Sequence, residues 1–185
     1  MLHSTPQRLV AILSLCGLLF SGVLLAATPG VWLDVPFIKQ EKDGCGAATI
    51  AMVMQYWLKQ QGKPVEASAD APTIQQELFS ASDHGIRAGD MERYFQQHGF
   101  RTFAFAGKWD DFLAQLQKGR PLIVALKPSR LETSLHYVVV VGVDPHENLV
   151  LLNDAAQRKL LKQDRAAFEK QWRAVKNWTL LALPK

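Results

Sequence analysis

The sequence predicts one α+β domain whose helices come first and whose strands, in an antiparallel sheet, come later. The chain has 185 residues, a length that fits a single domain with its own core. Hydrophobic residues make up 48% of it, which is too large a share for a disordered chain. Apolar residues recur at helical spacing in the first half, whereas short apolar runs typical of buried strands dominate the second half.

Residues 1–27 are predicted to lie outside this domain, as a secretory signal peptide. Arg8 supplies a basic start, residues 9–27 carry no charged side chain, and the small residues Ala26 and Ala27 close the run. The run also approaches the ~20 residues that a membrane-spanning helix needs, so an uncleaved membrane anchor is the alternative. In either case residues 28–185 are expected to be exported, to the periplasm or to the outer side of the inner membrane. Any membrane association would come from the N-terminal segment.

The first half of the domain is expected to contain an extended lead-in and three helices. Pro29 and Pro36 keep residues 28–37 extended, because proline does not continue a helix. Residues 44–61 are apolar on nearly all sides, which predicts a helix buried at the centre of the domain. The other elements expected here are a loop at residues 66–71, a short helix through residue 79 opened by a capping box of Thr73 and Gln76, a turn at residues 82–85, and a helix at residues 89–98 ended by Gly99.

The second half is expected to supply the sheet. The run from Val138 to Val141 predicts a strand that is buried on both faces. A turn at residues 145–148 separates this strand from the next one, so the two are expected to pair antiparallel. The expected strands are residues 100–106, 121–126, 136–143, 149–153 and 178–183, and the expected amphipathic helices are residues 108–118 and a segment capped by Asp164.

Cys45 is the first candidate for chemistry. Without residues 1–27, which contain Cys16, it is the only cysteine and has no partner for an internal disulfide. Gly44 and Gly46 flank it at the predicted start of the buried helix. Thiolate is the nucleophilic form of cysteine, and the unpaired N–H groups and dipole of a helix N-terminus favour it. The alternative is a small buried thiol without chemistry, but this context favours a nucleophile.

A thiol nucleophile needs a base, and His136 is the best-placed histidine. It opens the valine-rich strand, so its ring is expected where the core meets the surface. The alternative is a histidine that only fills the rim of the core. The other histidines fit less well: His84 and His146 lie in predicted turns, His98 ends a helix, and His3 belongs to the signal segment.

The base in turn needs a group that orients it. Asp154 ends the strand after the one that His136 opens, and antiparallel pairing would return it beside His136. An Asp that only starts a turn, or Asn153 as the orienting group, remain alternatives. Side chains alternate along a strand, so only one of Asn153 and Asp154 can face the imidazole. Gln40, upstream of Cys45, would complete an oxyanion hole with the backbone N–H of Cys45.

Composition excludes some partners. The chain has a net charge of +4, but its basic residues are scattered, so nucleic acid is not expected as a partner. No Gly-x-x-x-x-Gly-Lys loop for phosphate occurs.

Three motifs, taken in order, resemble the bacteriocin-processing, or double-glycine, peptidases, and among them the stand-alone exported members. The motifs are Val35-Pro36-Phe37-Ile38-Lys39-Gln40 with Asp43-Gly44-Cys45-Gly46-Ala47-Ala48, then Leu135-His136-Tyr137-Val138-Val139-Val140-Val141-Gly142, and then Leu151-Leu152-Asn153-Asp154. The sequence departs from the family pattern in two places. Gly44 stands where an Asp usually precedes the cysteine, and Ala155 stands where a Pro usually follows the aspartate.

The resemblance implies a papain-like fold, with the nucleophile on the buried central helix and the helices packed on an antiparallel sheet. It implies Cys45 as nucleophile, His136 as base and then acid, Asp154 as the orienting carboxylate, and Gln40 in the oxyanion hole. It also implies cleavage of a peptide or protein substrate through an acyl-enzyme, after Gly-Gly type sites. This chemistry needs no metal or organic cofactor, and the oligomeric state stays open. The rival interpretations are an amidase of cell-wall peptides and a papain-like domain that binds peptides without cutting them.

Overall fold

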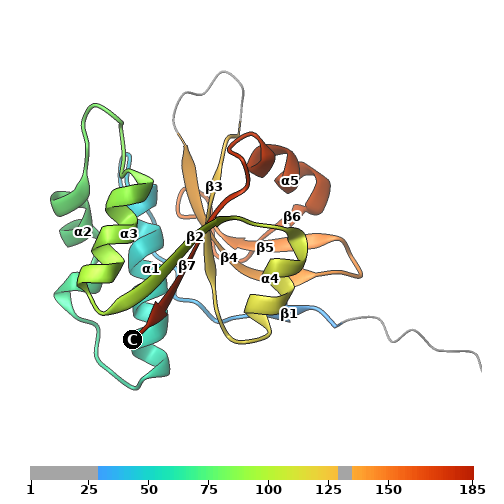
Figure 1. The fold of residues 1–185 in the computed structure, drawn as a ribbon, viewed down its shortest axis with the longest axis horizontal. Helices are drawn as coiled ribbons and strands as arrows, with labels where there is room; N and C mark the ends of the chain where they lie inside the picture. Colours follow the sequence, from blue (N-terminus) through green and yellow to red (C-terminus); the bar gives the residue numbers. More distant parts are fainter. Residues whose placement is uncertain (1–28, 129–134) are drawn as a thin grey trace, which may run out of the picture.

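The computed structural model describes residues 29–128 and 135–185, in which one antiparallel sheet of seven strands lies between two groups of helices (Figure 1). In chain order the elements are β1 (Val31–Trp32), α1 (Cys45–Gln60), the 3₁₀ helix η1 (Ala67–Ala69), α2 (Ala71–Leu78), α3 (Ala88–Gln97), β2 (Phe100–Ala106), α4 (Trp109–Leu116), β3 (Leu122–Leu126), β4 (His136–Asp144), β5 (Leu149–Asn153), β6 (Leu161–Asp164), α5 (Arg165–Arg173) and β7 (Trp178–Pro184). The expected α+β fold, with N-terminal helices packed on an antiparallel sheet, is confirmed.

The sheet has the strand order β2-β7-β3-β4-β5-β6, and β1 pairs with β4 outside this path. The consecutive strands β4 and β5 form a hairpin in which Val139 lies opposite Asn153. Because the strands run antiparallel, the end of β5 returns to the start of β4. The hairpin therefore brings residue 154 back beside the start of β4, which His136 opens, as the sequence predicted.

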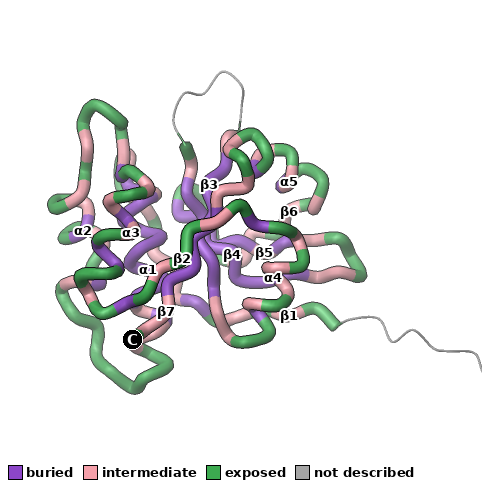
Figure 2. Tube along the Cα trace, in the orientation of Figure 1, coloured by how far each residue is buried: buried purple, intermediate pink, exposed green. Residues whose placement is uncertain are grey.

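The two faces of the sheet pack against different helices. In Figure 1, α1, α2 and α3 lie on one side of the sheet, and α4 and α5 lie on the other. Val139 and Val141 belong to the core shared with α1 to α3. Val138 and Val140 belong to the core shared with α4 and α5. The prediction that this strand is buried on both faces is confirmed, and Figure 2 shows the buried segments meeting at the sheet.

The second core is built from aromatic rings. Phe112 of α4 lies 4.7 Å from the ring of Trp172 and 5.8 Å from the ring of Phe168, measured between centroids. All three side chains are buried. The apolar spacing that predicted helices at residues 108–118 and after Asp164 therefore reflects a shared packing surface. Asp164 caps α5 as expected, because its Oδ1 accepts from the N–H of Ala167 at 2.9 Å.

Local predictions failed in two places. The capping box of Thr73 and Gln76 is wrong, because α2 begins at Ala71 and Asp70 is its N-cap, accepting from the N–H of Thr73 at 3.3 Å. Pro72 fits this earlier start, since proline is tolerated in the first turn of a helix.

Strand β6 was not predicted either. Its sequence Leu161–Asp164 contains one apolar residue, and it is a strand because it pairs with β5 at the edge of the sheet. The predicted loop at residues 66–71 contains the short helix η1.

Candidate active site

Cys45 is the first residue of α1 and is partly exposed. Gly44 is the N-cap, and no side chain of the described residues caps the first turn, so the N–H groups of this turn lie beside the thiol without a described side-chain acceptor. The residues that follow, from Gly46 to Met54, are buried. The apolar sequence therefore anchors the helix in the core, while its N-terminus presents the thiol at the surface.

Gly46 lets another segment approach the start of α1 very closely. A Cβ atom added to Gly46 would lie only 2.9 Å from the Cβ of Ile86, a distance that real Cβ atoms do not adopt. Ile86 is buried, and it follows a turn that is closed by a β-bridge between Ser80 and Gly85. The absence of a side chain at Gly46 therefore seats residues 80–87 against the nucleophile.

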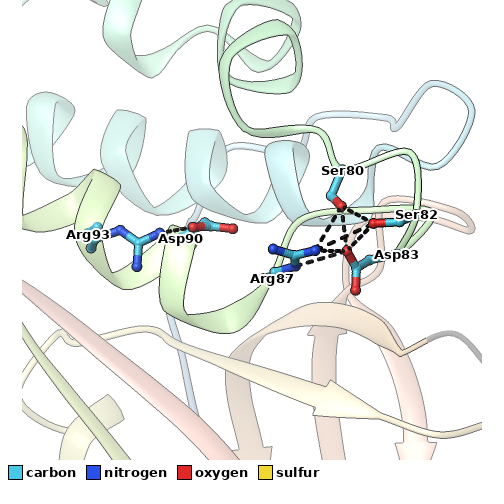
Figure 3. Close-up of polar contacts among 6 residues, drawn as sticks. All are labelled: Ser80, Ser82, Asp83, Arg87, Asp90 and Arg93. Atoms are coloured by element: carbon cyan, nitrogen blue, oxygen red, sulfur yellow. Dashed lines mark hydrogen bonds and ion pairs between the residues drawn. The ribbon is translucent and has the colours of Figure 1, made fainter.

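A polar network holds the same turn together (Figure 3). Arg87 donates from Nη2 to Asp83 Oδ2 at 2.6 Å, and the hydroxyl of Ser82 donates to the same oxygen at 3.0 Å. Ser80 also contacts this carboxylate. The hydrogen bond from Arg87, followed by those from the two serines, lowers the pKa of Asp83 to about 2. The carboxylate therefore stays ionised over the whole physiological range.

His136 opens β4, and its Nε2 lies 2.9 Å from Oδ1 of Asp154. The side chain of His136 is 21% exposed and that of Asp154 is 4% exposed, so the pair is largely shielded from water. The carboxylate occupies Nε2, which leaves Nδ1 as the ring nitrogen that is open to the thiol of Cys45.

Asp154 is held by more than His136. The N–H of Ala156 donates to Oδ1 at 2.9 Å, and the side-chain amide of Gln157 donates to Oδ2 at 2.7 Å. Both carboxylate oxygens therefore have donors. Gln157 was not among the site residues predicted from the sequence, where its only signal was a polar residue three positions after Asp154.

Asn153 faces the other way, as the alternation of side chains along β5 requires. Its amide donates to the carbonyl of Val35 at 3.1 Å, and its oxygen accepts from the N–H of Leu160 at 3.1 Å. Asn153 therefore ties the lead-in segment to the sheet, and Asp154 is the member of the two that meets His136.

The ionisation of the pair is set by three influences. Burial is the largest influence on His136 and by itself lowers its pKa. Hydrogen bonds with Asp154 and Cys45, together with the negative charges of both, outweigh burial and raise the pKa of His136 to about 10. Burial likewise opposes ionisation of Asp154, but its hydrogen bond with His136 and that residue's charge lower the pKa of Asp154 below 3.8. Near neutral pH the pair is thus imidazolium and carboxylate.

Gln40 lies in the loop before α1, and its backbone N–H donates to the carbonyl of Ala155 at 3.0 Å. This bond joins the loop to the segment that follows β5. The side-chain Oε1 of Gln40 is buried and has no hydrogen-bond partner among the described residues. The structure thus places Gln40 beside the other three predicted site residues, in the lining of one cavity.

One cavity of about 300 Å³, the central pocket, brings these residues together. Its described lining consists of Gln40, Asp43, Cys45, His84, Pro128, Leu135, His136, Asp154, Ala156 and Gln157. A second cavity of about 310 Å³, the side pocket, continues past Cys45 along Ile86, Ala88 and Tyr137. His84 is in a turn as expected, yet it lines both cavities. Asp43, which belongs to the motif around Cys45, also lines the central pocket.

This arrangement has the parts needed for nucleophilic attack on a carbonyl group. A thiol at a helix N-terminus lies beside an imidazolium that a carboxylate orients, and an amide side chain lines the same cavity. Within residues 29–128 and 135–185, no group of three His, Cys, Asp or Glu side chains is arranged to hold a metal ion. The same residues include no helix that is both long enough and apolar enough to cross a membrane. The predicted signal segment, residues 1–27, lies outside the described residues.

Comparison with known proteins gives one family match. The sequence model of the Peptidase_C39 like family matches residues 32–180, which is most of the chain. No curated protein matches the sequence.

Solved structures show the same fold at low sequence identity. A C39-like peptidase from Bacillus anthracis is 18% identical, with a TM-score of 0.61 over 85% of this chain and 99% of that one. A double glycine motif protease from an AMS/PCAT transporter, solved in complex with the leader peptide, is 20% identical, with a TM-score of 0.61 over 84% and 95% of the two chains. The peptidase domain of Streptococcus ComA, a bifunctional ABC transporter of a quorum-sensing pathway, is 19% identical, with a TM-score of 0.60 over 80% and 98%. At these identities the likeness concerns the fold.

Proposed function

The chain belongs to the Peptidase_C39 like family, and from this premise we propose that it is a cysteine peptidase with Cys45 as nucleophile. The observation that carries the proposal is the position of His136, which is bonded to Asp154 through Nε2 and interacts with Cys45. A structural histidine would not need a buried carboxylate on one side and the only described cysteine on the other.

In the proposed first step, the thiolate of Cys45 attacks the carbonyl carbon of a peptide bond. The oxygen becomes an oxyanion that accepts hydrogen bonds from the side-chain amide of Gln40 and the backbone N–H of Cys45. His136 then gives the proton on Nδ1 to the leaving nitrogen, and the C–N bond breaks. This step leaves an acyl group on the sulfur as a thioester.

In the proposed second step, His136 takes a proton from water, which attacks the thioester. The C–S bond breaks, the acid product leaves and gives its proton to the solvent, and the thiolate of Cys45 and the imidazolium of His136 are restored. Asp154 keeps Nδ1 directed at the reacting atoms through its bond to Nε2, and it balances the imidazolium charge. The finer assignment, cleavage after Gly-Gly type sites, is part of this proposal.

Thiol reactivity tests the nucleophile directly. The full chain is treated with iodoacetamide near neutral pH, and alkylation of the peptide that contains Cys45 is followed by mass spectrometry. We expect this site to react faster than a free model thiol, and His136→Ala to slow the reaction. Labelling no faster than the model thiol would favour a domain that binds peptides without cutting them.

Substrate profiling tests the reaction itself. The secreted proteins of cells with the intact chain are compared with those of cells with Cys45→Ala, and new protein N-termini are identified by mass spectrometry. New termini that appear only with the intact chain support a peptidase. A change confined to cell-wall peptide fragments would assign the same triad to cell-wall amides instead.

We also propose that the protein acts outside the cytoplasm, through the signal or anchor at residues 1–27. Cell fractionation with antibody detection tests this. We expect the chain in the periplasm or at the inner membrane, and a chain that lacks residues 2–27 in the cytoplasm. Equal location of the two chains would contradict the proposal.

A further inference from the structure

Asp43 is a half-buried carboxylate in the wall of the central pocket, two positions before Cys45. Among the described residues it makes no side-chain hydrogen bond and no ion pair, in contrast to Asp154, whose two oxygens both have donors. The basic residues nearest to it in sequence, Lys39 and Lys42, are exposed and do not pair with it in the described part of the chain. Among the described residues, Asp43 is thus the carboxylate of this pocket that has no partner.

The backbone explains a small polar residue at this position but not its charge. Asp43 has φ 56°, in the left-handed region that Asn, Asp and Gly adopt most readily. The turn is closed by the N–H of Gly44, which donates to the carbonyl of Glu41 at 3.0 Å. Asparagine would serve this turn equally well, so the negative charge needs a separate reason.

The carboxylate of Asp43 has no counter-charge in the described lining of the central pocket. The imidazolium of His136 is already balanced by Asp154, and His84 is the only other titratable group in the described lining. Among the described lining residues, the charge of Asp43 is therefore the one left unbalanced. An unbalanced carboxylate in a cavity attracts a cation.

The reaction geometry tells on which side of the scissile bond this cation lies. His136 has to protonate the leaving nitrogen, and it lines the central pocket and a further cavity beside Asp154 and Gln157, but not the side pocket. Of the two cavities that contain His136, only the central pocket is also lined by Cys45, so the leaving group lies there. Asp43 lines the central pocket and is absent from the lining of the side pocket. The carboxylate therefore faces the residues that follow the scissile bond.

We propose that Asp43 is a specificity-determining residue that binds the side chain of a Lys or Arg located just after the scissile bond of the substrate. This inference rests on the proposed peptidase function and names one feature of its substrate. The basic side chain would donate a charge-assisted hydrogen bond to the carboxylate and would supply the positive charge that Asp43 lacks among the described residues. No bond is made or broken by Asp43.

Matched peptides test this role. Internally quenched peptides with Gly-Gly before the expected cleavage point carry either Lys or norleucine at the first and second positions after it, and kcat/KM is measured for each with the full chain. We expect kcat/KM to be about tenfold higher for the Lys peptide, because one hydrogen bond to a charged group changes an equilibrium or rate by about that factor. Asp43→Asn should lower this ratio to about one, while the control Asp110→Asn, an exposed aspartate on α4, should keep it at about ten. A ratio near one in the unaltered chain, or a ratio that survives Asp43→Asn, would overturn the inference.

A binding measurement separates this inference from the peptidase proposal. Fluorescence anisotropy measures the affinity of the Lys and norleucine peptides for Cys45→Ala and for the double variant Cys45→Ala, Asp43→Asn. We expect about tenfold tighter binding of the Lys peptide to the first variant and equal binding of both peptides to the second. Discrimination in binding without cleavage by the unaltered chain would support Asp43 and contradict the peptidase proposal. Equal cleavage or equal binding of the Lys and norleucine peptides would reject the role of Asp43 and would leave the peptidase proposal standing.

Discussion

The two walls of the central pocket are built in different ways. On the sheet wall, His136 and Asp154 stand at the ends of paired strands, and every oxygen of Asp154 has a donor within the protein. On the helix wall, the Oε1 atom of Gln40 and the carboxylate of Asp43 have no partner among the described residues. The sheet wall is thus complete on its own, whereas both groups on the helix wall lack a described partner and the carboxylate of Asp43 lines the pocket. The difference fits the proposals that the sheet wall orients the base and that the helix wall contacts the substrate.

Removal of the nucleophile, which lies between the two walls, should have the largest effect on activity. Cys45→Ala is expected to lower kcat by about 10⁵-fold or more, because loss of a nucleophile from a triad removes nearly all of its chemistry. The assay is the cleavage of a peptide that the unaltered chain cuts. Cys16→Ala is the matched control and should keep full activity. Residual activity of Cys45→Ala within tenfold of the unaltered chain would remove Cys45 from the mechanism.

Loss of the orienting carboxylate tests whether the sheet wall acts as a unit. Asp154→Asn is expected to lower kcat by about 10³ to 10⁴-fold, because the imidazole loses its charge partner and its correct tautomer. Asn153→Asp, which alters the neighbour that faces away, is the control for position. This variant should lower the free energy of unfolding, whereas its kcat, measured per folded molecule, should change little.

The same substitution should shift the pH profile in a defined direction. Asp154 helps to raise the pKa of His136 to about 10, so imidazolium persists well above neutral pH and is lost as the pH approaches that value. Without the carboxylate the pKa of His136 falls, and the alkaline limb of kcat/KM should move to lower pH. The stability that protonated His136 adds to the fold should be fully present below about pH 6.5 and should decline as the pH rises toward 10. An alkaline limb that stays in place in Asp154→Asn would contradict this assignment.

The oxyanion donor tests the helix wall. Gln40→Ala is expected to lower kcat by about 10² to 10³-fold, because one side-chain donor to the oxyanion is lost. Thiol alkylation, which forms no oxyanion, should remain fast. This pair of measurements distinguishes Gln40 from His136, since His136→Ala is expected to slow both reactions. Equal loss of both reactions in Gln40→Ala would point to a structural role.

The smallest effect is expected from packing behind the nucleophile. Gly46→Ala would place a methyl group 2.9 Å from the Cβ of Ile86, so the segment of residues 80–87 has to move away from Cys45. Overpacking of this kind costs about 1 to 3 kcal/mol in the free energy of unfolding, which urea titration measures. Gly89→Ala, where the added Cβ meets only the end of Arg93 at 3.9 Å, is the matched control. A stability of Gly46→Ala equal to that of the control would show that the segment is not fixed against α1.

The sequence predicted the parts of the site whose placement follows from local pattern. Cys45 at the start of a buried helix and His136 at the start of a buried strand both follow from apolar runs that begin at these residues. The position of Asp154 followed from the antiparallel hairpin, because pairing across a short turn fixes which residues return to the same level. The capping box at Thr73 failed because two overlapping starts were available and Pro72 suits the earlier one.

Tertiary structure alone decided the rest of the pocket. Asp43, His84 and Gln157 come from three separate loops, and nothing in their local sequence indicates that they share a cavity. Strand β6 has too few apolar residues for a periodic signal, and it forms because β5 offers it unpaired backbone groups. Patterns along the chain determine which segments are helices and strands, since burial of one face depends on spacing. Contacts between loops depend on where the packed elements carry their ends, and only the folded chain determines that.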